Sequence, residues 1–132
     1  MILGFDPGRD KCGVAVMSFE REIIEHQVVN SQEAIAIIDH LAQKFSLQLL
    51  VMGNQTTAKS WQAKITAEFP ELPIIMIDER NSSLEARDRY WLMYPPQGLT
   101  RVIPQGMRLP SRPIDDIVAI LLIERYLRQN SL

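Results

Sequence analysis

Acidic side chains stand at three places where an apolar run of this chain begins or ends. The first is Asp6, the second is the pair Asp78 and Glu79, and the third is the pair Asp115 and Asp116. A carboxylate at the end of a buried strand costs free energy unless it is paired, hydrogen-bonded or bound to a cation. If these acids meet, they form an oxygen-rich site suited to Mg²⁺ or Mn²⁺. Two such ions would activate water and stabilise the leaving oxygen in phosphodiester cleavage.

Each acid also has a purely structural explanation. Either acid of the third pair, taken alone, is best explained as a cap at the start of a helix, where negative charge is favoured. Asp78 can pair with Arg80, and Asp6 can be a turn residue before Pro7. Glu79 lies two residues beyond the strand position Ile77 and shares its face, so it is the stronger candidate of its pair.

The elements that must position these acids follow from the apolar pattern. In chain order they are strands at 2–6, 13–19 and 23–29, a helix opened by a capping box at 30–33, a strand at 47–53, a helix at 57–69, a strand at 73–78, a helix opened by a second capping box at 82–85, and a last helix at 116–128. Three meandering strands followed by βαβ units predict a mixed sheet with helices on its faces. The first and last strands can both lie near the sheet centre, so the acids can converge at one edge.

A loop is predicted at 95–113, because this segment contains five prolines and two glycines. It is longer than most connections in compact domains, and such loops are usually functional or mobile. Because it ends just before Asp115, we expect it to border the acids and to move in the absence of substrate.

Positive charge is concentrated between residues 80 and 112. Six arginines stand there against Glu85 and Asp88, a local net charge of +4. Such a segment can face phosphate, or it can be a solvated helix face and loop. The arginines predicted to contact nucleic acid are Arg80, Arg87, Arg89, Arg108 and Arg112.

Three further features have competing interpretations. Gly4 lies on the same strand face as Asp6, and its missing side chain could let a phosphate backbone approach. The stripe Tyr90, Trp91 and Tyr94 can stack on unpaired bases, although such a stripe is more often core packing. His26 has no Cys or His at ligand spacing and is expected at the surface.

Composition bounds the class of protein. The 132 residues, 46% apolar and 23% charged, fit one globular domain over 1–132. The single Cys12 allows no internal disulfide, and we expect a reducing, cytoplasmic location without a signal peptide or membrane span. The net charge of −2 argues against a protein that coats nucleic acid by bulk electrostatics.

Three segments resemble motifs of RuvC-like resolvases and of the YqgF family within the RNase H-like superfamily. They are GFDPG and CGVAV near the start, IDERNSSLEA at 77–86, and IDD at 114–116 followed by IERYL at 123–127. The order and spacing agree over essentially the whole chain, and the segment at 77–86 is the most specific.

The resemblance implies a fold and a chemistry. The fold is RNase H-like, a five-stranded mixed sheet in the order 3-2-1-4-5 with helices on both faces. The catalytic, metal-binding acids are Asp6, Glu79 and Asp115, with Asp116 as an auxiliary acid or cap. The activity is Mg²⁺- or Mn²⁺-dependent hydrolysis of structured nucleic acid, in pre-rRNA processing or Holliday-junction resolution.

One segment departs from the family pattern. Where the family usually has GLP-x-N-x-x-G after the fourth strand, residues 52–57 read MGNQTT. This departure favours the alternative of a catalytically inactive RNase H-like module that only binds nucleic acid, whereas the three retained acids favour a nuclease. A third alternative, an actin-like kinase, needs two related domains to clamp a nucleotide. RNA and DNA substrates stay open, and so does the oligomeric state, with which a homodimer is compatible.

Overall fold

Five strands form one mixed sheet in a computed structural model that describes residues 1–110 and 112–130. The strands are β1 (Ile2–Asp6), β2 (Lys11–Met17), β3 (Ile23–Asn30), β4 (Leu49–Gly53) and β5 (Ile74–Ile77). Their order is β3-β2-β1-β4-β5. β1 pairs antiparallel with β2 and parallel with β4, and β4 pairs parallel with β5. The mixed sheet and the strand order implied by the resemblance are confirmed. The expectation that the last strand lies near the sheet centre is wrong, because β5 pairs with β4 and forms an edge.

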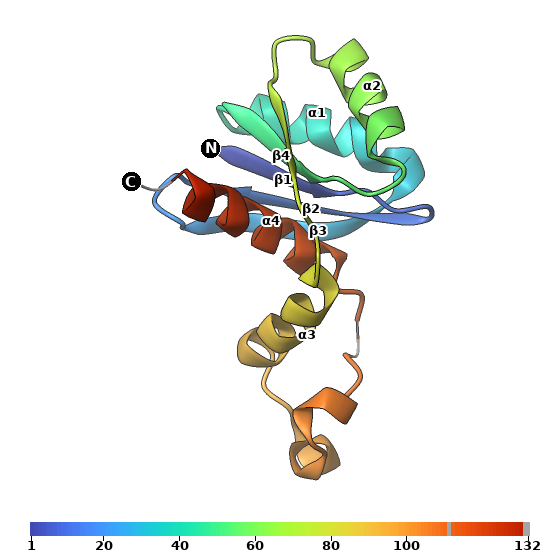
Figure 1. Cartoon of the computed structure of the whole chain (residues 1–132), viewed down its shortest axis with the longest axis vertical. Coiled ribbons are helices and arrows are strands. Elements are labelled where there is room, and N and C mark those ends of the chain that lie inside the picture. Colours follow the sequence, from blue (N-terminus) through green and yellow to red (C-terminus); the bar gives the residue numbers. More distant parts are fainter. Residues whose placement is uncertain (111, 131–132) are drawn as a thin grey trace.

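The described residues form four α-helices; three cover the two faces of this sheet, and the third in chain order packs mainly on the last and projects away from the sheet (Figure 1). They are α1 (Ala34–Lys44), α2 (Ala58–Glu68), α3 (Ser82–Met93) and α4 (Asp115–Gln129). The buried side chains of α4 pack on one face, whereas α1 and α2 pack on the other. β1 is therefore covered on both sides, which explains its continuous apolar sequence. None of the described helices is both long and apolar enough to cross a membrane.

Gly4 serves the packing of α4 rather than the approach of a phosphate. A Cβ at this position would collide with the backbone carbonyl of Ala119 and would lie 2.8 Å from Cγ1 of Ile123. Both residues belong to α4, so the missing side chain lets that helix lie directly against the middle of β1. The prediction that Gly4 gives room to a nucleic-acid backbone is wrong.

Both predicted capping boxes are also wrong in detail. Asn30 makes no side-chain cap, and a 3-10 turn at Ser31–Glu33 precedes α1. The Ser31 hydroxyl instead donates to the Gly8 carbonyl at 2.8 Å, which ties the β1–β2 hairpin to the start of α1. α3 begins after Asn81, whose φ of 61° is left-handed and whose side chain makes no cap bond.

The segment after α3, which we call the arm (95–110 and 112–113), projects away from the sheet together with α3 (Figure 1). It holds two short 3-10 turns, at Gly98–Val102 and Gln105–Met107, within the predicted loop. Apolar side chains on it are exposed, Leu99 to 86%. That the arm moves stays a prediction.

We expect Gly4→Ala to lower the free energy of unfolding by about 1–3 kcal/mol, because the added methyl must displace the α4 backbone. Urea denaturation measures this difference. Gly106→Ala is the matched control, since no heavy atom lies within 4 Å of the added methyl there. Equal stability of the two variants would contradict the close approach of α4 to β1.

Candidate active site

Asp6 stands at the carboxyl end of β1, between two glycines on the neighbouring strands. On β2, Gly13 is its direct partner in the antiparallel register. On β4, Gly53 follows Met52, which is the partner of Phe5. Because side chains alternate along paired strands, Asp6 and both glycines face the side of the sheet that α4 covers. The half-buried carboxylate therefore has no neighbouring side chain beside it on either adjacent strand.

Each glycine makes room for a second acid. A Cβ on Gly13 would collide with the backbone carbonyl of Asp115, and one on Gly53 would lie 2.7 Å from Oε2 of Glu79. The start of α4 thus rests on one neighbour of Asp6, and the Glu79 carboxylate rests on the other. The fold therefore places Glu79 and Asp115 on the two neighbours of Asp6, and that the three acids act as a catalytic set stays a prediction.

Glu79 lies on a turn that α4 braces. Arg125 of α4 donates to the carbonyls of Asp78 and Arg80, each at 2.7 Å, and to Oε1 of Glu85 at 2.9 Å. The Asp78 carboxylate accepts from the backbone N–H of Arg80 at 2.9 Å. This bond stabilises the turn, so Asp78 has a structural role here. One guanidinium therefore holds both sides of the Glu79 peptide unit.

The electrostatics of Asp6 reflect this crowding. Burial raises its pKa from the ordinary value of 3.8 to about 7, and the charges of Asp115 and Glu79 contribute to the rise. A hydrogen bond from Nε2 of Gln55, at 3.0 Å, opposes it. The carboxylate is thus costly to ionise without a nearby positive charge.

The two neighbouring acids are shifted in the same direction. Burial raises the pKa of Glu79, as does Asp78, whereas Arg125 lowers it. Burial also raises the pKa of Asp115, opposed by a hydrogen bond to its own backbone and by the positive charge of Lys11. Three carboxyl groups with raised pKa values around one strand end form a site that favours a cation.

Asp116 is turned away from solvent and its carboxylate is occupied. It is fully buried, accepts from Nη2 of Arg112 at 2.8 Å, and shares a hydrogen bond with Nδ1 of His26 at 2.6 Å. Its other oxygen accepts from the backbone N–H of Ile117 at 3.0 Å. These contacts tie the arm and β3 to α4. That Asp116 also binds metal stays a prediction. The expectation that His26 is a surface residue is wrong, because its ring is mostly buried and bonded to Asp116.

The donor set fits a hard cation, although the acids are not drawn together into a closed site. In the described part of the chain, no three His, Cys, Asp or Glu side chains cluster closely enough to hold a metal ion. Asp6, Glu79 and Asp115 offer only oxygen ligands, which Mg²⁺ and Mn²⁺ prefer. Their pKa values are raised chiefly by burial, and a bound cation would favour the ionised forms.

The predicted nucleic-acid-binding arginines divide into two groups. Arg89 pairs with Glu124 at 2.6 Å, Arg112 pairs with Asp116, and Nε of Arg108 donates to the Ile103 carbonyl at 2.8 Å. Arg80 and Arg87 are exposed and form no ion pair within 1–110 and 112–130. The second group is therefore free to meet phosphate, and binding by any of the five stays a prediction.

Three residues at the site were missed as functional candidates, namely Lys11, His26 and Arg125. Lys11 begins β2 and lines a cavity of about 440 Å³ with His26 and Arg112 beside the acids. Arg125 braces the Glu79 turn from the last helix. Their contacts come from pairing across the sheet and between helices, so no local pattern in the sequence marks them.

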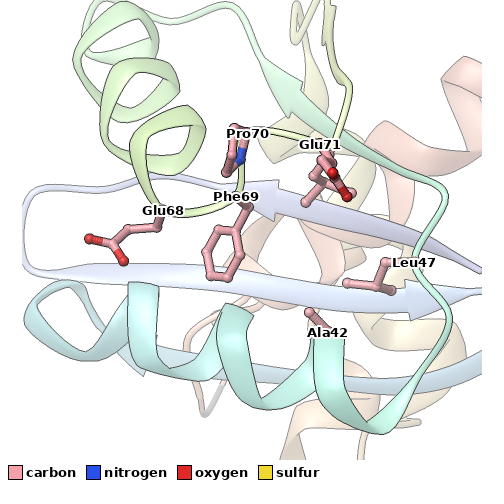
Figure 2. Close-up of a pocket in the computed structure, with 7 residues that line it drawn as sticks. Ala42, Leu47, Glu68, Phe69, Pro70 and Glu71 are labelled. Atoms are coloured by element: carbon pink, nitrogen blue, oxygen red, sulfur yellow. The ribbon is translucent and has the colours of Figure 1, made fainter.

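Another cavity of similar size lies far from the acids. Figure 2 shows Phe69 and Pro70 beyond α2 near Ala42 of α1 and Leu47, around a space of about 460 Å³. These residues stand at the edge where β4 begins, opposite the edge where β1 and β4 end. Glu68 and Glu71 line it, and their charge disfavours phosphate. The acids around Asp6 therefore remain the candidate site.

Comparison with known proteins gives relatives along nearly the whole chain. The "Putative pre-16S rRNA nuclease" of Xylella fastidiosa (strain M12) is 26% identical over 141 residues, covering 96% of this chain and 86% of the relative. The protein of the same name from Xanthomonas axonopodis pv. citri (strain 306) is 29% identical with the same coverage.

A solved structure gives the same fold. Thermus thermophilus RuvC superimposes with a TM-score of 0.54 at 13% identity, over 98% of this chain and 96% of that chain. At this identity the likeness concerns the fold alone, which is RNase H-like. The family model described as "RuvX: Holliday junction resolvase" matches residues 1–129. Because that match spans almost the entire sequence, the chain belongs to the RuvX family, whose relatives also carry the name YqgF.

Proposed function

We propose that this protein is a divalent-metal-dependent nuclease that hydrolyses phosphodiester bonds in structured nucleic acid. The observation that carries the proposal is the position of Asp6 at a buried strand end beside Glu79 and Asp115. Burial, and to a smaller extent the charges of these two acids, raises the Asp6 pKa to about 7. Carboxyl groups with perturbed pKa values that lie near one another are typical of catalytic sites. The positive charges of Arg125 and Lys11 lower the pKa values of Glu79 and Asp115, but both pKa values remain raised.

Asp6, Glu79 and Asp115 would hold the cation. When bound, Mg²⁺ or Mn²⁺ supplies an activated water and stabilises the charge on the leaving oxygen. The residues of this chain place the acids: Arg125 holds the Glu79 turn, Gln55 orients Asp6, and Gly13 admits Asp115. Asp116 keeps the arm beside them through Arg112.

The substrate class comes from the family and from the free arginines. The family description names a Holliday junction resolvase, and the relatives are named as pre-16S rRNA nucleases. Both are branched or folded nucleic acids with accessible phosphates. Arg80 and Arg87 lie on the turn and helix that follow Glu79. A nucleic-acid strand whose phosphates bind there would therefore pass close to the acids.

The inactive binding module is the second candidate. The observation that favours it is the departure at 52–57 from the family pattern. Gln55 of this segment nevertheless donates to Asp6. Because the divergent segment still serves the acid site, we favour the nuclease.

Asp6→Asn should abolish Mg²⁺- or Mn²⁺-dependent cleavage, because the amide keeps the shape of the side chain and removes the charge that holds the cation. The assay uses an rRNA precursor fragment and a four-way DNA junction, with folding checked by circular dichroism. Asp10→Asn, an exposed acid at the hairpin tip, is the charge-matched control and should cleave normally. Wild-type protein that cleaves neither substrate with either metal would leave the inactive module as the function.

Asp6→Asn should also stabilise the metal-free fold in a pH-dependent way. The native state binds this proton more tightly than the unfolded chain, so the wild type loses stability as the pH rises from about 4 through about 7. At about 1.4 kcal/mol per pKa unit, the loss is up to roughly 4 kcal/mol. Urea denaturation in EDTA should show the largest advantage of the variant at pH 8 and none near pH 4.

Added Mg²⁺ should reverse this advantage, because the ion stabilises the native wild type. If the variant is more stable than the wild type by the same amount at pH 8 and near pH 4, ionisation of Asp6 does not destabilise the native state.

Replacing Arg80 and Arg87 together by Ala should weaken binding and flatten its salt dependence. Each lost phosphate contact lowers the slope of log K against log salt by about 0.9 on duplex DNA. Fluorescence anisotropy over a salt series measures the slope, and cleavage at saturating substrate should persist. Arg128→Ala, exposed near the end of α4, is the control. If the double variant keeps the wild-type slope, the phosphates contact residues other than Arg80 and Arg87.

A further inference from the structure

A third cavity, of about 390 Å³, lies between the end of α3 and the arm. Aromatic and proline side chains dominate its lining, among them Trp91, Tyr94, Pro95 and Pro96. Its volume falls within the range of pockets that hold small organic groups. The acids do not line it, so the proposed chemistry does not account for it.

Two hydrogen-bond donors at this cavity are unsatisfied. Nε1 of Trp91 and Nη1 of Arg112 are buried, and neither has a hydrogen-bond partner among the residues that the structure describes. Both groups can only donate. A buried donor without a partner costs free energy, so a ligand that brings acceptors would be favoured here.

Guanidinium groups lie over two aromatic rings that line this cavity, one from Arg112, which also lines it, and one from Arg108, which does not. The Arg112 guanidinium lies 5.6 Å from the centre of the Tyr94 ring, and the Arg108 guanidinium lies 5.6 Å from that of Trp91. The Tyr94 residue is 40% exposed, so its ring is accessible from outside. Aromatic rings and guanidinium planes are the surfaces on which unpaired bases stack. A free phosphate would gain nothing from the rings and prolines.

Arg112 connects this cavity to the acids. Its Nη2 is bonded to Asp116, the residue after Asp115, while Nη1 is left without a partner. A strand whose phosphate lies at the acids could therefore place a neighbouring base at the cavity. We propose that this cavity, which we call the base pocket, binds one unpaired nucleobase of the substrate, with carbonyl acceptors toward Trp91 and Arg112. The proposal rests on the proposed function and adds recognition of an unpaired nucleotide to it.

Trp91 provides a direct reporter of binding. In a Trp61→Phe background it is the only tryptophan, since Trp61 lies on α2 across the sheet, 5.2 Å from the Phe5 ring centre. Three duplexes of equal length are titrated in EDTA, which prevents metal-dependent cleavage. One carries a pyrimidine overhang, one an abasic overhang and one a blunt end, each made as RNA and as DNA.

We expect the pyrimidine overhang alone to quench Trp91 fluorescence. Tyr94→Ala should weaken binding of that ligand about 5- to 150-fold, the range expected for one lost base stack. Tyr94→Phe should restore affinity because it keeps the ring. Leu92→Ala, 78% exposed on the same helix and outside the cavity, should bind like the parent protein.

The outcomes separate the base pocket from the nuclease proposal. If all three duplexes bind equally and Tyr94→Ala matches Leu92→Ala, the base pocket is wrong and nucleic-acid binding stands. If no duplex binds but the four-way junction of the cleavage assay does, the base pocket is wrong and the nuclease proposal stands. The RNA and DNA sets show which backbone carries the preferred base.

Discussion

The site depends on the absence of side chains on either side of Asp6. Three carboxylates can approach one strand end only where the neighbouring strands leave space, and Gly13 and Gly53 leave that space on β2 and β4. A Cβ at Gly13 would push the start of α4 outward and carry Asp115 with it. One at Gly53 would meet the Glu79 carboxylate. The acids are therefore placed by backbone geometry, and their mutual repulsion is opposed by the packing of the whole sheet.

α4 contributes both to the stability of the fold and to the placement of the acids. Its residues 117–123 are buried against the sheet, and that burial fixes the helix over β1. The same helix supplies Asp115 at its start and Arg125 near its end, where Arg125 braces the Glu79 turn. Because one rigid element holds both flanking acids, a shift of α4 would move them together relative to Asp6. The apolar packing of α4 on the sheet therefore determines how precisely the acids are positioned.

Most of the fold was predictable, because long apolar runs and their spacing determine which elements form. The bounds of β1 agree with the prediction, and the sheet order follows from the family resemblance. The capping boxes failed because Ser31 bonds across the hairpin to Gly8, a contact that local sequence does not encode. The three acids were identified from the sequence, whereas His26 and Arg125 were missed, since each acts on a residue at least 45 positions away.

The arginines show how tertiary pairing changes a reading based on charge alone. Six of them between 80 and 112 look like one basic surface, yet Arg89 and Arg112 neutralise acids of α4. Arg112 retains a free donor after pairing, because a guanidinium has five N–H groups and a carboxylate uses only some of them. That surplus gives the residue two roles, since it anchors the arm to Asp116 and offers a donor to the base pocket. A lysine could place its charge there, but it lacks the planar face that stacks on Tyr94. The arm's position and its affinity for a ligand are therefore coupled through one side chain.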